Sequence, residues 1–429
     1  MDSPALQPMA YVCLVSSYNL PELEACLLRR PSDALLVVSD GFIAGAQRLR
    51  QRLESNLAGI RVHMLHQSET GQPLDGDDLL QGQQWVRDVL LPRLHGLARE
   101  SKEARLNLTG GTKAMAVALL HGCRWQSVDY RAQGRRELQV LRAESAGERP
   151  GLDFHALPRL PVPDVSPLEV ALLHGNDVHI GKPSRIASRH PEASLQLAET
   201  LWQALAGEDA DLLLLFERLE WLWSEESKEP AYVCNLLTLP WREFLAGRSC
   251  PDGLLAWLER FRALAPDCLH WDGETLTLPG NGAHKLAKDL RAWISGTWLE
   301  QLAYRWLREA GTPHEAIALN LKSGLVPGNS SSQREADLLV HYRSITSLVE
   351  AKAGLPPGGS PAELEQQVSS LGDRFGRTRK SLLLGPLLQR RLRGEGRWES
   401  FQLRCKANSV ILCTGKAELL DFVAGRGGQ

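Results

Sequence analysis

Short apolar runs alternate with helix-patterned stretches through the first 120 residues of the chain. The apolar runs occupy 10–16, 33–40, 60–66 and 105–108, and each is followed by a stretch whose apolar residues have helical spacing. A repeated strand-then-helix order places the strands side by side in one direction, so it predicts a parallel, Rossmann-like sheet. In such sheets, ligands bind beyond the carboxyl ends of the strands.

Two polar, turn-rich loops are expected at that edge: "SSYNLP" (16–21) after the first run and "TGGTK" (109–113) after the fourth. The two glycines let the backbone turn sharply and approach a ligand. Thr109 or Thr112 caps the next helix, whose free N–H groups suit an anion, and Lys113 adds a full charge. The spacing is not that of a P-loop. A strand–turn–helix corner without a ligand is the alternative interpretation.

Length, charge and cysteine usage set broad limits. The chain has 429 residues, which suggests two or three domains, and a formal net charge of -2, so any nucleic-acid contact must come from a local patch. None of the eight cysteines has CxxC spacing, which fits free thiols in a reducing cytoplasm. We expect no signal peptide and no membrane contact, because no apolar run reaches the roughly 18 residues of a membrane span.

A proline-rich stretch, "RLPVPDVSP", marks the expected end of the first domain. The expected domains are 1–160, 161–284 and 285–429. The middle segment is rich in Leu and Trp at helical spacing and contains a small hairpin at 269–280. It is either a winged-helix-like module or a helical spacer.

The third segment contains a group of charged residues with a pattern that suggests catalysis. Residues 334–354 have the pattern of a β-hairpin, with Asp337 on the first strand and both Glu350 and Lys352 at the end of the second. An antiparallel hairpin brings Asp337 to Glu350, and the i, i+2 spacing puts Glu350 and Lys352 on one face. Two carboxylates at one point repel each other unless a cation lies between them.

A helix and a basic tail flank this hairpin. The amphipathic helix 295–311 carries Glu300 among apolar residues, where it contacts either the same site or solvent. From residue 371 onward the chain has 12 Lys/Arg and 5 Asp/Glu, a local positive excess in a chain of net charge -2. A basic groove beside a metal site suits a phosphodiester backbone, and a solvated surface is the alternative.

This order of elements and residues resembles the PD-(D/E)xK, restriction-endonuclease-like nuclease core, with Ala336–Asp337 in place of "PD". "NLTGGTKAMAVAL" is likewise similar to the strand–loop–helix of CARF domains, the CRISPR-associated Rossmann-fold sensors. "GTWLEQLAYRWL", "EADLLV" and "LVEAKAG" are similar to the nuclease half of CARF-fused CRISPR ancillary nucleases. The resemblance covers about 1–160 and 285–429.

The resemblance implies an α/β protein with a CARF domain, a middle segment and a nuclease domain. It implies a homodimer that binds cyclic tetra-adenylate and, once activated, cleaves DNA or single-stranded RNA with Mg²⁺ or Mn²⁺. The activator contacts would be Ser16, Ser17 and Asn19 in the first loop, and Thr109, Gly110, Gly111, Thr112 and Lys113 in the second.

On the same resemblance, Asp337, Glu350 and the Ala351 carbonyl would hold the metal. Glu300 would bind it directly or through water, and Lys352 would position the attacking water. Gln366 or Gln367 on the following helix would help to place the substrate. The products would carry 5′-phosphate ends.

Three other interpretations remain open at this point. The chain could be a ligand-sensing transcriptional regulator whose winged-helix-like middle segment binds DNA, without nuclease activity. It could be a nuclease fold that only binds DNA, or a CARF domain that also cleaves its own activator. The metal-free HEPN ribonuclease route is not favoured, because the third segment lacks an RxxxxH motif.

Overall fold

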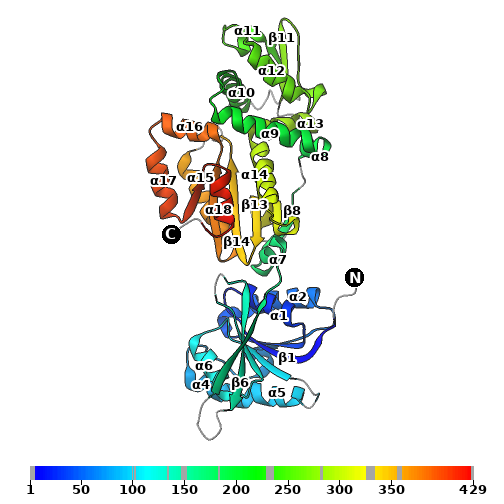
Figure 1. Cartoon of the computed structure of the whole chain (residues 1–429), viewed down its shortest axis with the longest axis vertical. Coiled ribbons are helices and arrows are strands. Elements are labelled where there is room, and N and C mark those ends of the chain that lie inside the picture. Colours follow the sequence, from blue (N-terminus) through cyan, green and yellow to red (C-terminus); the bar gives the residue numbers. More distant parts are fainter. Residues whose placement is uncertain are drawn as a thin grey trace.

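The computed structural model describes residues 5–98, 100, 103–132, 135–145, 152–181, 184–228, 236–280, 284–324, 334–354 and 360–426. Among these residues, the strands form a seven-stranded, a six-stranded and a three-stranded sheet. Figure 1 shows the parts stacked along the long axis of the molecule, with the six-stranded sheet between the other two. The last part of the sequence therefore lies in the centre of the molecule.

The first sheet has the doubly wound arrangement that the strand–helix alternation predicts. Its order in the described part of the chain is β3-β2-β1-β4-β5-β6-β7. Neighbours from β3 to β5 are parallel, and β6 and β7 continue the sheet antiparallel. The strands are β1 (Gln7–Leu14), β2 (Pro31–Val37), β3 (Arg61–Leu65), β4 (Glu103–Asn107), β5 (Ser127–Tyr130), β6 (Glu137–Ser145) and β7 (Leu152–Pro161). The predicted Rossmann-like sheet is confirmed.

Helices cover both faces of this sheet because alternate strand residues are apolar on opposite sides. Tyr11 and Cys13 of β1 belong to one core, and Val12 and Leu14 to the other. The first core is covered by α1 and α2, and the second by α4, α5 and α6. The helices are α1 (Leu20–Arg29), α2 (Ile43–Asn56), α3 (Gln67–Thr70), α4 (Leu79–Trp85), α5 (Leu91–Ala98) and α6 (Lys113–Gly122).

The second sheet combines a meander with two parallel strands. Its order in the described residues is β16-β15-β14-β13-β12-β8, antiparallel from β8 to β14 and parallel from β14 to β16. The strands are β8 (Asp177–Ile180), β12 (Ile317–Gly324), β13 (Arg334–Tyr342), β14 (Ile345–Lys352), β15 (Thr378–Leu384) and β16 (Val410–Cys413). The edge strand β8 comes from the segment expected to form the middle domain, whose limits stay a prediction.

Helices pack on both faces of the second sheet. One core includes residues of α14 and α18, and the other includes residues of α15 and α17. These helices are α14 (Trp298–Glu309), α15 (Pro361–Gly372), α16 (Pro386–Gly394), α17 (Trp398–Ala407) and α18 (Lys416–Val423). The linking helix α7 (Pro167–Leu173) contributes Val170 to the core of the first domain and Ala171 to a core of the last.

The middle segment has the element order of a winged helix. Helix α10 is followed by β9, α11, α12 and the β10–β11 hairpin, and β9, β10 and β11 form an antiparallel sheet. The elements are α8 (Arg185–Arg189), α9 (Pro191–Ala206), α10 (Ala210–Lys228), β9 (Leu236–Pro240), α11 (Trp241–Phe244), α12 (Asp252–Arg262), β10 (His270–Trp271), β11 (Thr275–Pro279) and α13 (Lys285–Ala292). The predicted hairpin at 269–280 is present.

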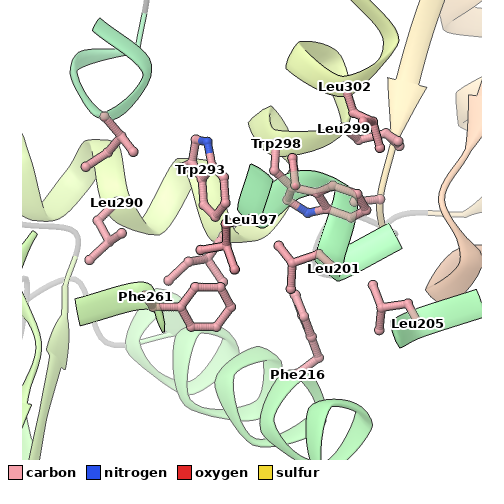
Figure 2. Packing of buried hydrophobic residues seen from close by; sticks show 14 of the residues in the cluster. Leu197, Leu201, Leu205, Phe216, Phe261, Leu290, Trp293, Trp298, Leu299 and Leu302 are labelled. Atoms are coloured by element: carbon pink, nitrogen blue, oxygen red, sulfur yellow. The ribbon is translucent and has the colours of Figure 1, made fainter. Parts of the chain in front are cut away.

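One apolar core joins the middle segment to the last domain. Phe261 and Trp293 meet edge to face with ring centroids 6.4 Å apart, and Trp298, the first residue of α14, lies in the same core (Figure 2). The same core extends to Val349 on β14. These two parts are therefore packed as one unit. In the described part of the chain, every helix is too short or too polar to traverse a lipid bilayer.

Candidate functional site

The β13–β14 hairpin brings the two predicted carboxylates together. Leu338 pairs with Val349, and this register places Asp337 opposite Glu350. The Asp337 backbone N–H donates a hydrogen bond to Glu350 Oε1 at 3.2 Å. This geometry confirms the sequence-based expectation that Asp337 and Glu350 meet. They meet because a two-residue turn fixes the antiparallel register of the hairpin.

Lys352 lies between the carboxylates. Its Nζ donates to Asp337 Oδ2 and to Glu350 Oε2, each at 3.0 Å. The Ala351 N–H donates to Asp337 Oδ2 at 2.8 Å, which fixes the orientation of that carboxylate. Asp337, Glu350 and Lys352 thus converge on one point at the end of the hairpin.

Burial and mutual repulsion govern the electrostatics of this point. Glu350 is fully buried, and its burial, with a further contribution from Asp337, raises the pKa of its carboxyl group to about 8. Burial lowers the pKa of Lys352, but the two carboxylates outweigh it, so this pKa lies above its ordinary value. A positive charge placed here is therefore strongly stabilised.

Glu300 approaches the same point from the first turn of α14. Its burial raises the pKa of the carboxyl group to about 8, and the charge of Asp337 adds to that effect. A π-helical turn (Trp293–Thr297) precedes α14 and contains Gly296. Glu300, Asp337 and Glu350 line one cavity, although they come from separate elements.

The cavity has a volume of about 1020 Å³ and carries an excess of acidic side chains. Among the described residues that line it, the acidic ones are Asp289, Glu300, Glu335, Asp337, Glu350 and Glu363, and the basic ones are Arg334 and Lys352. Gln366 and Gln367 of α15 also line it. A Ser360–Glu363 capping box fixes the start of α15 and so the place of these two amides.

The donor set fits a hard divalent cation. Mg²⁺ keeps several waters and is commonly held by one or two carboxylates together with substrate phosphates. Asp337 and Glu350 supply such a pair, and their repulsion is relieved here only partly by the single charge of Lys352. A cluster of three or more His, Cys, Asp or Glu side chains placed to chelate an ion is not found in the described residues.

The two predicted activator loops lie together at the carboxyl edge of the first sheet. Ser16 N–H donates to Asn19 Oδ1 at 2.9 Å, so the buried Asn19 side chain shapes the first loop. In the second loop, Thr109 Oγ1 donates to Asn107 Oδ1 at 2.6 Å. Thr112, rather than Thr109, caps α6, accepting the Met115 N–H at 3.3 Å.

The two glycines of the second loop have separate structural causes. A Cβ on Gly110 would lie 2.1 Å from the Leu14 carbonyl oxygen and 2.5 Å from Glu22 Oε1. Gly111 has φ +74°, in the left-handed region that favours glycine. The loop therefore lies directly against the end of β1. Ser17 and Lys113 are exposed beside it.

Several residues at this edge are not indicated by any sequence motif. Arg131 follows β5, and its backbone N–H donates to Thr109 Oγ1 at 3.0 Å. Its side chain forms a buried ion pair with Glu24 of α1. Tyr18 lies within the predicted loop 16–21, and its ring stacks on His174, 5.4 Å between centroids. In the sequence, only the position of Tyr18 inside that predicted loop pointed to a role at this edge.

Known proteins resemble this chain in structure rather than in sequence. No protein-family model and no curated protein sequence matches the chain. Protein VC1899 from Vibrio cholerae superposes with a TM-score of 0.68 at 14% identity, over 97% of this chain and 97% of that one. Can2 from Sulfobacillus thermosulfidooxidans, solved in complex with cyclic tetra-adenylate, superposes with a TM-score of 0.64 at 17% identity, over 97% and 96%.

The chain has the fold of both proteins. Because the similarity covers nearly the full length of each, it includes the Rossmann-like sheet, the middle segment and the six-stranded sheet. The predicted site residues stay predictions that rest on the geometry described above.

Proposed function

We propose that this protein is a CARF-type CRISPR ancillary effector, a metal-dependent nuclease activated by cyclic tetra-adenylate. The observation that carries the proposal is the convergence of Asp337, Glu350 and Lys352 at the end of one hairpin, within a cavity that Glu300 also lines. The activator is proposed from the two loops of the first sheet and from a fold neighbour, Can2, solved with that molecule.

Each residue has a separate role in the proposed hydrolysis. Asp337, Glu350 and the Ala351 carbonyl would hold Mg²⁺ or Mn²⁺, which when bound polarises a phosphate and lowers the pKa of a bound water. Lys352 orients the attacking water and stabilises the charge that develops on the phosphate. Glu300, which lines the same cavity, would bind the metal directly or through water. Gln366 or Gln367 would help to place the nucleic acid.

The regulator alternative has one observation in its favour, the winged-helix order of the middle segment. DNA recognition by such a module requires a positively charged helix face. The exposed positions of α12 include Asp252 and Glu259 beside Arg260, and the β10–β11 turn carries Asp272 and Glu274. This charge pattern favours the nuclease over a DNA-binding regulator.

The first experiment tests activator and metal together. Purified protein is mixed with supercoiled plasmid, single-stranded DNA and single-stranded RNA in Mn²⁺, with and without cyclic tetra-adenylate. Glu350→Ala and Lys352→Ala are assayed beside it, with Glu335→Ala as an exposed control from the same cavity. We expect cleavage that requires both Mn²⁺ and cyclic tetra-adenylate. It should disappear in Glu350→Ala and Lys352→Ala and persist in the control Glu335→Ala.

Each other result has a definite meaning. Activator binding without cleavage of any substrate would support the regulator. Cleavage that does not depend on the activator would leave the nuclease and remove the CARF assignment.

The proposed homodimer is tested by light scattering of the same preparation.

A further inference from the structure

A second cavity, of about 490 Å³, lies between the first and last domains. Ser16, Thr109 and Arg131 line it from the first domain, and Thr346 and Arg377 line it from the last domain. Ser16 and Thr109 are among the proposed activator contacts. The cavity is therefore continuous with the proposed activator site, yet part of its wall belongs to the nuclease domain.

The charge of this cavity suits an anion. Arg377 and Arg379 line it together with Arg131, whose side chain is paired with Glu24, and the described lining residues include no Asp or Glu. Guanidinium groups bind phosphate oxygens through several N–H donors in a fixed plane. The hydroxyls of Ser16 and Thr346 add neutral donors to the same wall. A phosphodiester is the ligand chemistry that this lining matches.

Tyr18 connects the first activator loop to the nuclease domain. The Arg377 guanidinium lies over its ring, 5.4 Å from the centroid, and the ring stacks on His174 from the linking segment. Tyr18 and Thr346 both line the cavity, one from each domain. The conformation of the loop at 16–19 and the position of Arg377 therefore depend on each other.

A buried polar cluster makes the same connection beneath the cavity. His341 Nε2 on β13 lies 3.5 Å from Oε1 of Glu24 on α1, and Glu24 is the ion-pair partner of Arg131. His341 Nδ1 is also 3.0 Å from Thr346 Oγ1 on β14. The same two strands carry Asp337 and Glu350 towards the end of the hairpin that lies away from the turn. The hairpin thus spans the distance from the activator edge to the candidate active site.

We propose that the activator is held by both domains, with one of its phosphodiester groups in this cavity and Arg377 of the nuclease domain in contact with it. The inference rests on the proposed function and adds to it the means of regulation. A ligand that contacts two domains stabilises the arrangement in which both contacts are made. The hairpin transmits that arrangement to the carboxylates.

The test is equilibrium binding of fluorescently labelled cyclic tetra-adenylate to the full chain, measured by anisotropy. The variants are Arg377→Gln and, as a matched control, Arg390→Gln, which removes an exposed arginine from α16 of the same domain. We expect Arg377→Gln to raise the Kd about tenfold, as for the loss of one charged hydrogen bond, and Arg390→Gln to leave it within about twofold. Thr346→Val should raise the Kd less than Arg377→Gln.

The outcomes separate this inference from the function on which it rests. Unchanged binding by Arg377→Gln, with tight binding by the unmodified protein, would overturn the inference and leave the activator assignment intact. Failure of the unmodified protein to bind the activator would remove both. Equal weakening by Arg377→Gln and Arg390→Gln would indicate general charge attraction, and it would also overturn the inference.

Discussion

Glu350 shows how burial of a single carboxyl group sets a pH dependence. Its pKa is raised from an ordinary value of 4.5 to about 8, chiefly by burial. Between these two values the native protein retains a proton that the unfolded chain has lost. Stability contributed by that proton is complete at low pH and is lost as the pH rises through about 8. A bound dication would replace the proton and restore the stability.

We therefore expect the melting temperature of the metal-free protein to fall as the pH rises between 4.5 and about 8. Glu350→Gln, which cannot ionise, should reduce that fall by about 2–4 °C. Calorimetric scans across this range provide the measurement, with Glu335→Gln as an exposed control from the same cavity. Mn²⁺ should raise the melting temperature of the unmodified protein at high pH. If the melting temperature of Glu350→Gln fell with pH as steeply as that of the unmodified protein, the Glu350 carboxyl group would be ionised throughout this pH range.

The second activator loop depends on the absence of a side chain at Gly110. A Cβ there would meet the Leu14 carbonyl oxygen at 2.1 Å, a backbone atom that cannot turn away. We expect Gly110→Ala to destabilise the protein by about 1–3 kcal/mol and to weaken activator binding, because the loop must move away from β1. Gly41, whose Cβ position has no neighbour within 4 Å, provides the control substitution Gly41→Ala. Equal melting temperatures for the two variants, measured by thermal unfolding, would contradict this account.

At the scale of elements, the β13–β14 hairpin connects both proposed sites. Tyr342 pairs with Ile345, which leaves Arg343 and Ser344 as a two-residue turn. Both turn residues have positive φ, 52° and 60°, as a type I′ turn requires. Neither is the Asn or Gly that adopts this conformation most easily. The turn therefore retains a conformation that costs its residues free energy.

The double substitution Arg343→Asn/Ser344→Gly should stabilise the hairpin. Asn-Gly is the preferred sequence of a type I′ turn, and we expect a gain of about 0.5–1 kcal/mol. Thermal unfolding of the full chain measures it, and the single variant Arg343→Asn separates the two contributions. A lower melting temperature would indicate that the buried Ser344 side chain contributes more to the domain interface than the turn geometry costs.

At the scale of the whole molecule, the order of the parts in space differs from their order in the sequence. The last domain lies between the first domain and the middle segment (Figure 1). It shares a core with the middle segment and a cavity with the first domain. In the proposed mechanism, a change at the proposed activator loops would therefore reach the last domain directly, without passing through the middle segment.

This arrangement predicts where the activator protects the backbone. Amide hydrogen exchange at 343–346 should slow when cyclic tetra-adenylate is added, because this turn lines the cavity, although it belongs to the last domain. The β10–β11 turn at 272–274, in the part farthest from the first domain, provides the internal control. Protection confined to the first domain, measured by mass spectrometry, would contradict direct coupling through the hairpin.

The sequence alone determined the features that depend on local order. Strand–helix alternation predicts the parallel sheet because short crossovers impose it, and the hairpin pattern predicts that Asp337 meets Glu350 because antiparallel register follows from the turn. Tertiary structure alone decided the rest. Arg377 lies over Tyr18, and β8 joins the edge of β12, through contacts between residues more than one hundred positions apart. Such contacts depend on how whole domains pack, and no local periodicity encodes that packing.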